Sequence, residues 1–320
     1  ATNKVGEVAR RNRVASLTLT WSRPRVRTGL SITGGAELEW RDFHSHPESL
    51  SVHLQPPLPD HTLHYPGLVL AAGWSNLSRS TLSLGPEDGL SLGVTARRRW
   101  RTSDPEGTTA HSVIGVARLY TSLPLGGHAR HVLALRGTFG WAEPHTTSLF
   151  SVGGVSGTSL EILPGYSVGD VQRSFFVRGF APGVLSGIRA WGGTAEYRAP
   201  LARVGRGLWP LPLFWQRSAL AVFGDAGSAW CPVFAAPTAT CPAGGTRRAT
   251  LASVGAELLL DATVDYDTPT RFRLGVAAPV AGDVASADRD HVRRDVEGVQ
   301  GLDNTNRSHQ VDLNGAVERA

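Results

Sequence analysis

Apolar and polar residues alternate one by one along most of this chain. In the segment 29–40, GLSITGGAELEW, the even positions hold apolar residues or glycine and the odd positions hold polar residues or glycine. Successive side chains of a β-strand point to opposite faces, so this segment predicts a strand with one apolar and one polar face. The same alternation occurs at 14–21, 90–97, 251–260 and 271–276.

Further segments bring the predicted strands to ten, and no segment has the period of a helix. They are 67–76, 111–121, 130–140, 192–200 and 218–227. The segment 111–121 is the least regular, because Arg118 falls in the same register as Ile114 and Val116. The sequence therefore predicts an all-β protein.

Alternation also occurs in water-soluble sandwiches and propellers, but other features favour a transmembrane barrel. The predicted strands run for about 9–12 residues, the length that a tilted membrane-spanning strand needs. Their polar faces carry Glu, Arg, Thr and Gly, which suit a hydrated lumen. Aromatic residues near the strand ends are typical of the girdles at membrane interfaces: Trp21, Trp40, Trp74, Trp100 and Tyr120. We predict an antiparallel transmembrane β-barrel with about ten strands present.

The connections between the predicted strands alternate between shorter and longer ones. Barrels of the outer membrane have short periplasmic turns and longer outside loops. This rule assigns 41–66, 101–110, 141–191 and 228–248 to the outside. The connection 141–191 is too long to be a simple link between neighbouring strands.

The long connection contains QRSFFVRGFAPG, in which Arg178 lies among aromatic residues. The strand 218–227 places Asp225 on its inward face, and the strand 192–200 places Glu196 there. Two inward acids on adjacent strands are costly without a cation. Arg178, folded back into the lumen, would bind both carboxylates through its fork of donors. The alternative is that Arg178 is a solvated loop charge and Asp225 lines a wet pore.

The neighbours of these charges fit a lumen-inserted loop. Gly179 allows the backbone to bend sharply next to Arg178. Phe180 and Phe223 are expected to pack beside the charges and exclude water, and Gly227 shares the inward face of Phe223.

Composition excludes several function classes. The chain has 320 residues, a net charge of +5 and a pI near 9.7, and its only dense basic run is ARRRW at 96–100. This charge does not indicate a nucleic-acid partner. The chain contains no methionine, so we expect a piece of a longer reading frame. It has neither a signal peptide at its start nor an apolar run of ~20 residues.

Cys231 and Cys241 lie in a stretch with little regular pattern. We favour a loop-closing disulfide in an oxidising compartment, and the alternative is two unpaired thiols. No metal site is predicted there, because neither CxxC nor HxxxH is present.

Other local patterns have simpler explanations. GYSVG around Ser167 matches the string of serine hydrolases, but that motif needs a strand–turn–helix elbow and no helix is predicted after it. His44, His46 and Glu48 fall in a polar outside loop and are interpreted as surface residues rather than metal ligands.

Three motifs resemble one known family. They are VRGF (Val177, Arg178, Gly179, Phe180), GGTAEYRAPL at 192–201 and FGDAG at 223–227. Residues 254–279 also resemble the closing strands of the same barrel. Together they make residues 13–279 similar to the C-terminal barrel of the BamA/TamA-like outer-membrane assembly factors, the bacterial surface antigen superfamily.

The resemblance implies a sixteen-stranded barrel in which a long outer loop enters the lumen. It implies that Arg178 binds Glu196 and Asp225. On this interpretation residues 1–280 form a barrel domain that lacks its first strands and the preceding periplasmic domains. Residues 281–320 are charged and end in Ala320 rather than in an aromatic residue, so we expect a flexible polar tail.

The family implies insertion of barrel proteins, or translocation of polypeptide, in the bacterial outer membrane. The expected partners are outer-membrane lipid, client polypeptides and accessory assembly proteins. No enzymatic activity, cofactor, metal, nucleic acid or small-molecule substrate is expected. The alternative is a passive pore or structural surface antigen without insertase activity.

Overall fold

The computed structural model describes most of the chain. The described ranges are 8–45, 61–80, 83, 85–100, 109–144, 149–154, 161–163, 166–167, 173–207, 211–234, 241–265, 268–282 and 293–301. In these ranges no helix is long and apolar enough to cross a membrane.

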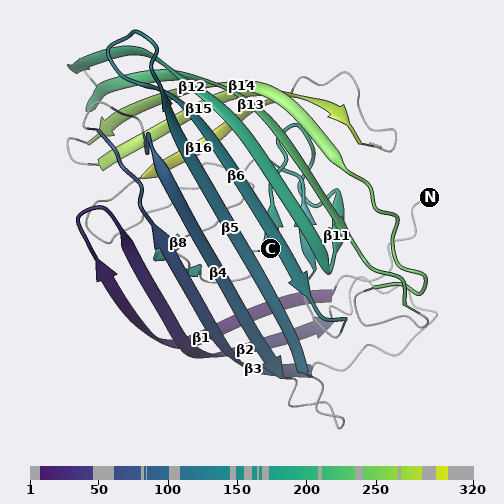
Figure 1. Cartoon of the computed structure of the whole chain (residues 1–320). Helices are drawn as coiled ribbons and strands as arrows, with labels where there is room; N and C mark the ends of the chain where they lie inside the picture. Colours follow the sequence, from purple (N-terminus) through teal and green to yellow (C-terminus); the bar gives the residue numbers. More distant parts are fainter. Residues whose placement is uncertain are drawn as a thin grey trace.

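One large sheet dominates the structure (Figure 1). Its strands are β1 (Val8–Pro24), β2 (Gly29–Ser45), β3 (His61–Ser75), β4 (Gly89–Trp100), β5 (Thr109–Leu123), β6 (His131–Ala142), β12 (Arg189–Gly207), β13 (Leu213–Trp230), β14 (Leu251–Val264), β15 (Thr268–Ala281) and β16 (Arg293–Gly301). Every neighbouring pair is antiparallel, and the strands lie side by side in chain order. This confirms the predicted all-β antiparallel fold. Within the described residues the sheet is open, with β1 and β16 at its edges.

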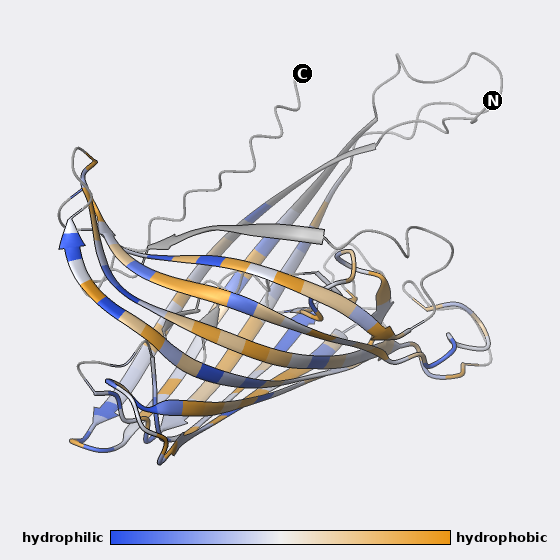
Figure 2. Ribbon diagram, turned by 90° about the horizontal axis from the view of Figure 1, so that it is seen from above, coloured by the Kyte–Doolittle hydropathy of each residue, from blue (hydrophilic) through white to orange (hydrophobic). Residues whose placement is uncertain are grey.

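The two faces of the sheet have the opposite character to those of a water-soluble protein. Large apolar side chains on the outer face stay exposed, including Leu70 at 57% and Val222 at 50%. The inner face buries polar side chains, including Glu37, Thr95 and Asp225. Figure 2 shows the resulting alternation of apolar and polar residues along the coloured strands of the curved sheet. An apolar exterior around a polar interior is the pattern of a membrane-spanning barrel.

The connection between β6 and β12 contains short strands of its own. They are β7 (Phe150–Val152), β8 (Glu161–Leu163), β9 (Tyr166–Ser167), β10 (Ser174–Phe175) and β11 (Leu185–Gly187). Strand β7 lies between β10, which is parallel to it, and β11, which is antiparallel. This small sheet contacts the inner face of the large sheet at β12 and β13, and we call it the inner sheet (Figure 1).

The main apolar core lies between the inner sheet and the wall of the large sheet. Its fully buried side chains include Phe150, Val152 and Val177 of the inserted segment. Ile188, just before β12, and Leu251, at the start of β14, are buried in the same core. The connections 143–188 and 231–250 leave the same end of the sheet, which we call the long-loop end. The turns 25–28 and 76–88 lie at the opposite, short-turn end. The core therefore lies toward the long-loop end of the lumen.

The last strand differs from the sequence prediction. A flexible tail is predicted over 281–320, but Arg293–Gly301 forms β16 and pairs with β15. The edge of β15 offers free backbone N–H and C=O groups, and pairing with them needs no particular side chains. A charged segment that shows no alternation can therefore still form a strand. The weak alternation at 311–317 lies outside the described residues.

Tyr120 also differs from its predicted place in an aromatic girdle. It shares a face of β5 with Ser112 and Ile114, both of which are buried. The Arg198 guanidinium carbon, on the inner face of β12, lies 5.8 Å from the centroid of the Tyr120 ring. Tyr120 therefore faces the lumen, and a position near a strand end does not by itself place a ring at the membrane interface.

We predict that Val222→Arg destabilises the folded protein by about 2–4 kcal/mol, because it places a charge on the lipid face near the middle of β13. Val26→Arg is the matched control, since Val26 is fully exposed in the turn 25–28 and its replacement keeps the charge in water. Urea titrations of both variants folded into phosphatidylcholine vesicles measure the difference. Equal midpoints would contradict the assignment of the outer face.

Candidate functional site

The inner sheet places Arg178 inside the lumen. Val177 is fully buried and forms a β-bridge with Gly154, which fixes the backbone immediately before the arginine. Gly179 follows with φ of 86°, a conformation that residues with a Cβ rarely adopt. The chain therefore turns sharply behind Arg178, whose side chain is only 5% exposed.

Asp225 of β13 receives most of the hydrogen bonds from Arg178. Nε donates to Oδ2 at 2.7 Å and Nη2 donates to Oδ1 at 2.8 Å, so the guanidinium and the carboxylate meet fork to fork. The backbone N–H of Arg178 also donates to Oδ2 at 3.2 Å. This last bond fixes the loop backbone as well as the side chain.

A second acid, Glu257 of β14, completes the direct contacts. Arg178 Nη1 donates to Glu257 Oε1 at 2.7 Å. The other oxygen of Glu257 accepts hydrogen bonds from Arg273 of β15, one of them from Nε at 3.2 Å. Glu257 was not among the partners that the sequence assigns to Arg178. A signal for it existed, because the alternation of 251–260 places Glu257 inward with Ser253, which lies opposite Asp225.

Glu196 of β12, the predicted partner, lies farther away. Its Oε2 is 3.7 Å from Arg178 Nη1, which is an ion pair without a hydrogen bond. Its other oxygen accepts a hydrogen bond from Nε of Arg198. Arg198 therefore supplies the main counter-charge of Glu196.

The charges of three acids and three arginines compensate one another at this site. The acids Asp225, Glu257 and Glu196 are each at most 5% exposed as whole residues. The cations Arg178, Arg198 and Arg273 face them. Burial alone would lower the pKa of Arg178, but its hydrogen bond and attraction to Asp225, followed by attraction to Glu257, outweigh this effect and raise its pKa. The loop thus contributes a permanent positive charge that contacts acids on three adjacent strands, and Arg273 of β15 joins the cluster through Glu257.

Phe223 and Gly227 of β13 shape the space around the arginine. The guanidinium carbon of Arg178 lies 3.3 Å from the centroid of the Phe223 ring, which is a close cation–π contact. A Cβ on Gly227 would lie 3.0 Å from methyl groups of both Val152 and Val177. Gly227 therefore gives the inner sheet room to approach the wall.

The aromatic residues around Arg178 have separate partners. Phe175 stacks on Phe150 with a centroid distance of 5.7 Å, and Phe180 is buried in the apolar core. The Arg136 guanidinium carbon, on β6, lies 4.5 Å from the centroid of the Phe176 ring. The three phenylalanines thus pack within the inserted segment, in the apolar core and against β6.

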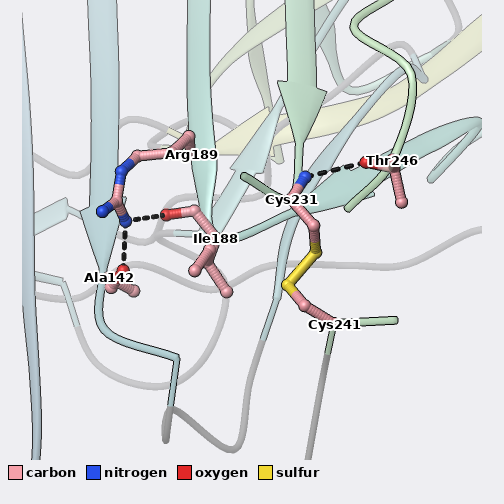
Figure 3. The surroundings of a disulfide bond; sticks show 6 residues. All are labelled: Ala142, Ile188, Arg189, Cys231, Cys241 and Thr246. Carbon is pink, nitrogen blue, oxygen red and sulfur yellow. Dashed lines mark hydrogen bonds between the residues drawn. A yellow bond between two sulfur atoms is a disulfide. The ribbon is translucent and has the colours of Figure 1, made fainter. Parts of the chain in front are cut away.

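Cys231 and Cys241 form a disulfide with a Cα–Cα distance of 5.7 Å (Figure 3). Both residues are buried in the same apolar core as Val177. The backbone N–H of Cys231 donates to Thr246 Oγ1 at 2.7 Å. The bonded loop between β13 and β14 therefore packs against the inner sheet at the long-loop end.

The remaining candidate residues do not join this site. Ser167 lies in β9, which pairs with β8, and the residues after it, 168–172, are outside the described ranges. The backbone of His44 belongs to β2, while His46 and Glu48 also lie outside those ranges. Within the described residues no group of three His, Cys, Asp or Glu side chains is arranged to hold a metal ion.

The comparisons with known proteins concern the fold. No family model matches the sequence, and no curated protein is significantly similar to it. The structure is similar to that of BamA from Haemophilus ducreyi lacking POTRA domains 1–3, with 16% sequence identity and a TM-score of 0.52. The match covers 91% of this chain and 53% of that chain, so this chain spans about half of the BamA chain. The likeness shows that the open sheet has the fold of a BamA barrel wall.

We predict that Asp225→Asn destabilises the protein by about 3–5 kcal/mol, because it leaves the buried Arg178 without its two-pronged partner. Glu196→Gln is the matched control and is expected to cost clearly less, since Glu196 only approaches Arg178 at 3.7 Å. Chemical unfolding followed by tryptophan fluorescence measures both. The assignment of Asp225 as the principal partner fails if Glu196→Gln is the more damaging change.

We predict that reduction of the disulfide destabilises the long-loop end by about 2.5 kcal/mol, the entropy of opening a ten-residue loop. Thermal unfolding with and without a reducing agent measures this, and Cys231→Ser combined with Cys241→Ser should melt like the reduced protein. If reduction lowers the stability of this double variant too, the effect of the reductant does not come from the disulfide.

Proposed function

We propose that this chain is the membrane-embedded part of an outer-membrane protein that inserts barrel proteins or translocates polypeptide. The proposal places it in the bacterial outer membrane, with lipid as its surroundings. Client polypeptides and accessory assembly proteins are its proposed partners.

One observation carries the proposal. A long loop enters the lumen and presents Arg178 to acids of β13 and β14, while Glu196 of β12 lies beside them. This arrangement agrees with what the VRGF and FGDAG motifs imply by their resemblance to the BamA/TamA-like assembly factors. The likeness of the sheet to a BamA barrel supports the same conclusion from an independent direction.

The proposed mechanism contains no covalent step. A strand at the edge of a sheet carries backbone N–H and C=O groups without partners, and these groups pair readily with another extended chain. An edge of the large sheet would template a strand of the client in this way. The Arg178 network would keep the wall rigid while the edge exchanges partners, because it joins four strands through buried charges.

One observation favours a second candidate function, a passive pore or structural surface antigen. Ion pairs line the inner face well away from Arg178, including Arg99 Nη1 with Glu39 Oε2 at 2.7 Å. Such a charged lining is typical of a water-filled lumen. The apolar core at the long-loop end argues against free passage, so we place this candidate second.

The deciding experiment follows the folding of a client. The protein is reconstituted in vesicles of Escherichia coli polar lipid, and a urea-unfolded eight-stranded outer-membrane barrel is added. Folding of the client, followed by its heat-modifiable migration on a gel, is expected to accelerate by at least about fivefold over empty vesicles. Vesicles with an equal amount of an unrelated porin control for general disturbance of the bilayer.

Acceleration no greater than that of the porin vesicles would reject the insertase function. A steady single-channel conductance without acceleration would then favour the passive pore.

A further inference from the structure

The basic run ARRRW at 96–100 lies at the long-loop end of β4, and its arginines divide between the two faces of the sheet. Arg97 Nε lies 3.3 Å from Glu37 Oε1, and Arg99 Nη1 lies 2.7 Å from Glu39 Oε2. Both acids are buried on the inner face of β2. The inward arginines of the run are therefore neutralised within the lumen.

Arg98 points to the outer face and has a different kind of partner. It alternates with the inward arginines on β4 and shares its face with Leu92 and Val94, which are 44% and 42% exposed. Its guanidinium carbon lies 5.6 Å from the centroid of the Trp100 ring, two residues farther along the same face. An exposed arginine thus lies against a tryptophan where the apolar residues of β4 end.

Arg189 and Trp141 repeat this arrangement on β12 and β6. The two residues are opposite each other in the strand register, and the Arg189 guanidinium carbon lies 4.9 Å from the centroid of the Trp141 ring. Arg189 Nη1 donates to the backbone oxygens of Ala142 and Ile188 (Figure 3). Its Nε and Nη2 donate to no acceptor within the described residues. These two nitrogens therefore remain available to a ligand.

A third pair lies next to these residues at the same end of the sheet. Trp230 of β13 is opposite Arg189 in the register of β12 and β13, so it is on the outer face too. The guanidinium carbon of Arg248, which is exposed in the chain before β14, lies 4.4 Å from the centroid of the Trp230 ring. We call the three pairs the arginine–tryptophan belt: Arg98 with Trp100, Arg189 with Trp141, and Arg248 with Trp230.

The belt marks the long-loop edge of the apolar outer face. On β6 the exposed residues Leu135 and Phe139 precede Trp141 on the same face. Aromatic residues at such an edge lie at the level of the lipid headgroups in membrane barrels. At the short-turn end, Trp21 and Trp74 have no arginine against their rings within the described residues. The pairing with arginine therefore distinguishes the long-loop edge.

The arginines of the belt do not have the acidic partners of the inward arginines. Within the part of the chain that the structure describes, none of the three forms an ion pair with an acid. A tryptophan ring covers one flat side of a guanidinium, but the N–H donors lie in the guanidinium plane and can still bind an anion. Phosphate oxygens match this planar set of donors. The belt thus offers positive charge that suits a phosphate.

We propose that the arginine–tryptophan belt binds the phosphate groups of anionic lipids in the leaflet around the long-loop end. The guanidinium groups bind the phosphate, and the apolar residues next to the belt contact the acyl chains. This continuity of charged and apolar surface favours a lipid over a soluble phosphate. The inference rests on the part of the proposed function that places the outer face in a membrane.

Native mass spectrometry tests the preference for anionic lipid. The folded protein in dodecyl maltoside micelles receives equal amounts of phosphatidylglycerol and phosphatidylcholine with identical acyl chains, and the lipids retained after removal of the detergent are counted. We expect at least about fivefold more phosphatidylglycerol than phosphatidylcholine, the factor that one arginine near a lipid surface supplies. Equal retention of the two lipids would overturn the proposal.

Two triple variants locate the binding site. The first removes the charges of the belt and is expected to lower the lipid preference at least about fivefold; its changes are Arg98→Gln, Arg189→Gln and Arg248→Gln. The matched control removes the same charge from exposed arginines at the short-turn end and is expected to keep the preference; its changes are Arg23→Gln, Arg25→Gln and Arg27→Gln. The belt is not the site if the control lowers the preference as much as the first variant does.

Heat-modifiable migration on a gel verifies that each variant is folded. Because Arg189 also binds two backbone oxygens, the double variant of Arg98→Gln with Arg248→Gln replaces the first triple variant if that one does not fold. Its preference is expected to fall at least about threefold.

An excess of inorganic phosphate is expected to leave the retained phosphatidylglycerol unchanged, and displacement of the lipid would refute a lipid site. No client protein takes part, so a failure here is distinct from a failure of the insertase function. An outer face that does not lie in a membrane would instead appear as equal midpoints for Val222→Arg and Val26→Arg.

Discussion

The fork-to-fork contact of Arg178 with Asp225 is the interaction on which the arrangement of the lumen depends. Both side chains are at most 5% exposed, and an isolated charge in such a place is too costly to persist. The acids of β13 and β14 therefore require the arginine, and the arginine requires its loop to enter the lumen. This requirement explains why the inner sheet lies against the wall rather than extending outward. It also explains the small residue at Gly227, where any side chain would separate the two surfaces.

The same requirement divides the lumen into two regions. Where the inner sheet covers the wall, buried apolar residues such as Ile114 and Leu251 form one core with it. Farther along the strands, the inward residues are charged and form ion pairs, such as that of Asp261 with Arg217 and Arg271. On the opposite face of the wall, large apolar side chains such as Leu70 and Val222 are exposed. One sheet thus has an apolar core on part of its inner face and a polar lining on the remainder.

This division shows which features the sequence predicts and which it does not. The ten strands follow from period two alone, and the inward placement of Glu196 and Asp225 follows from the same parity. Ile114 is apolar on the inward face of β5 because it belongs to the apolar core around the inner sheet, which no local signal reveals. Glu257 was not predicted as a partner of Arg178, because strand pairing brings the two side chains together across 79 positions of sequence. β16 forms by backbone pairing with β15. Such pairing does not require an alternating pattern of side chains, so the sequence does not predict it.

Glu196 occupies a different role from the one its motif suggests. Its carboxylate lies between two arginines, at hydrogen-bonding distance from Arg198 but at 3.7 Å from Arg178. Removal of either arginine therefore changes the net charge near the other arginine. Because Arg198 belongs to β12 and Arg178 belongs to the long loop, Glu196 links the charge of the loop to a charge of the wall.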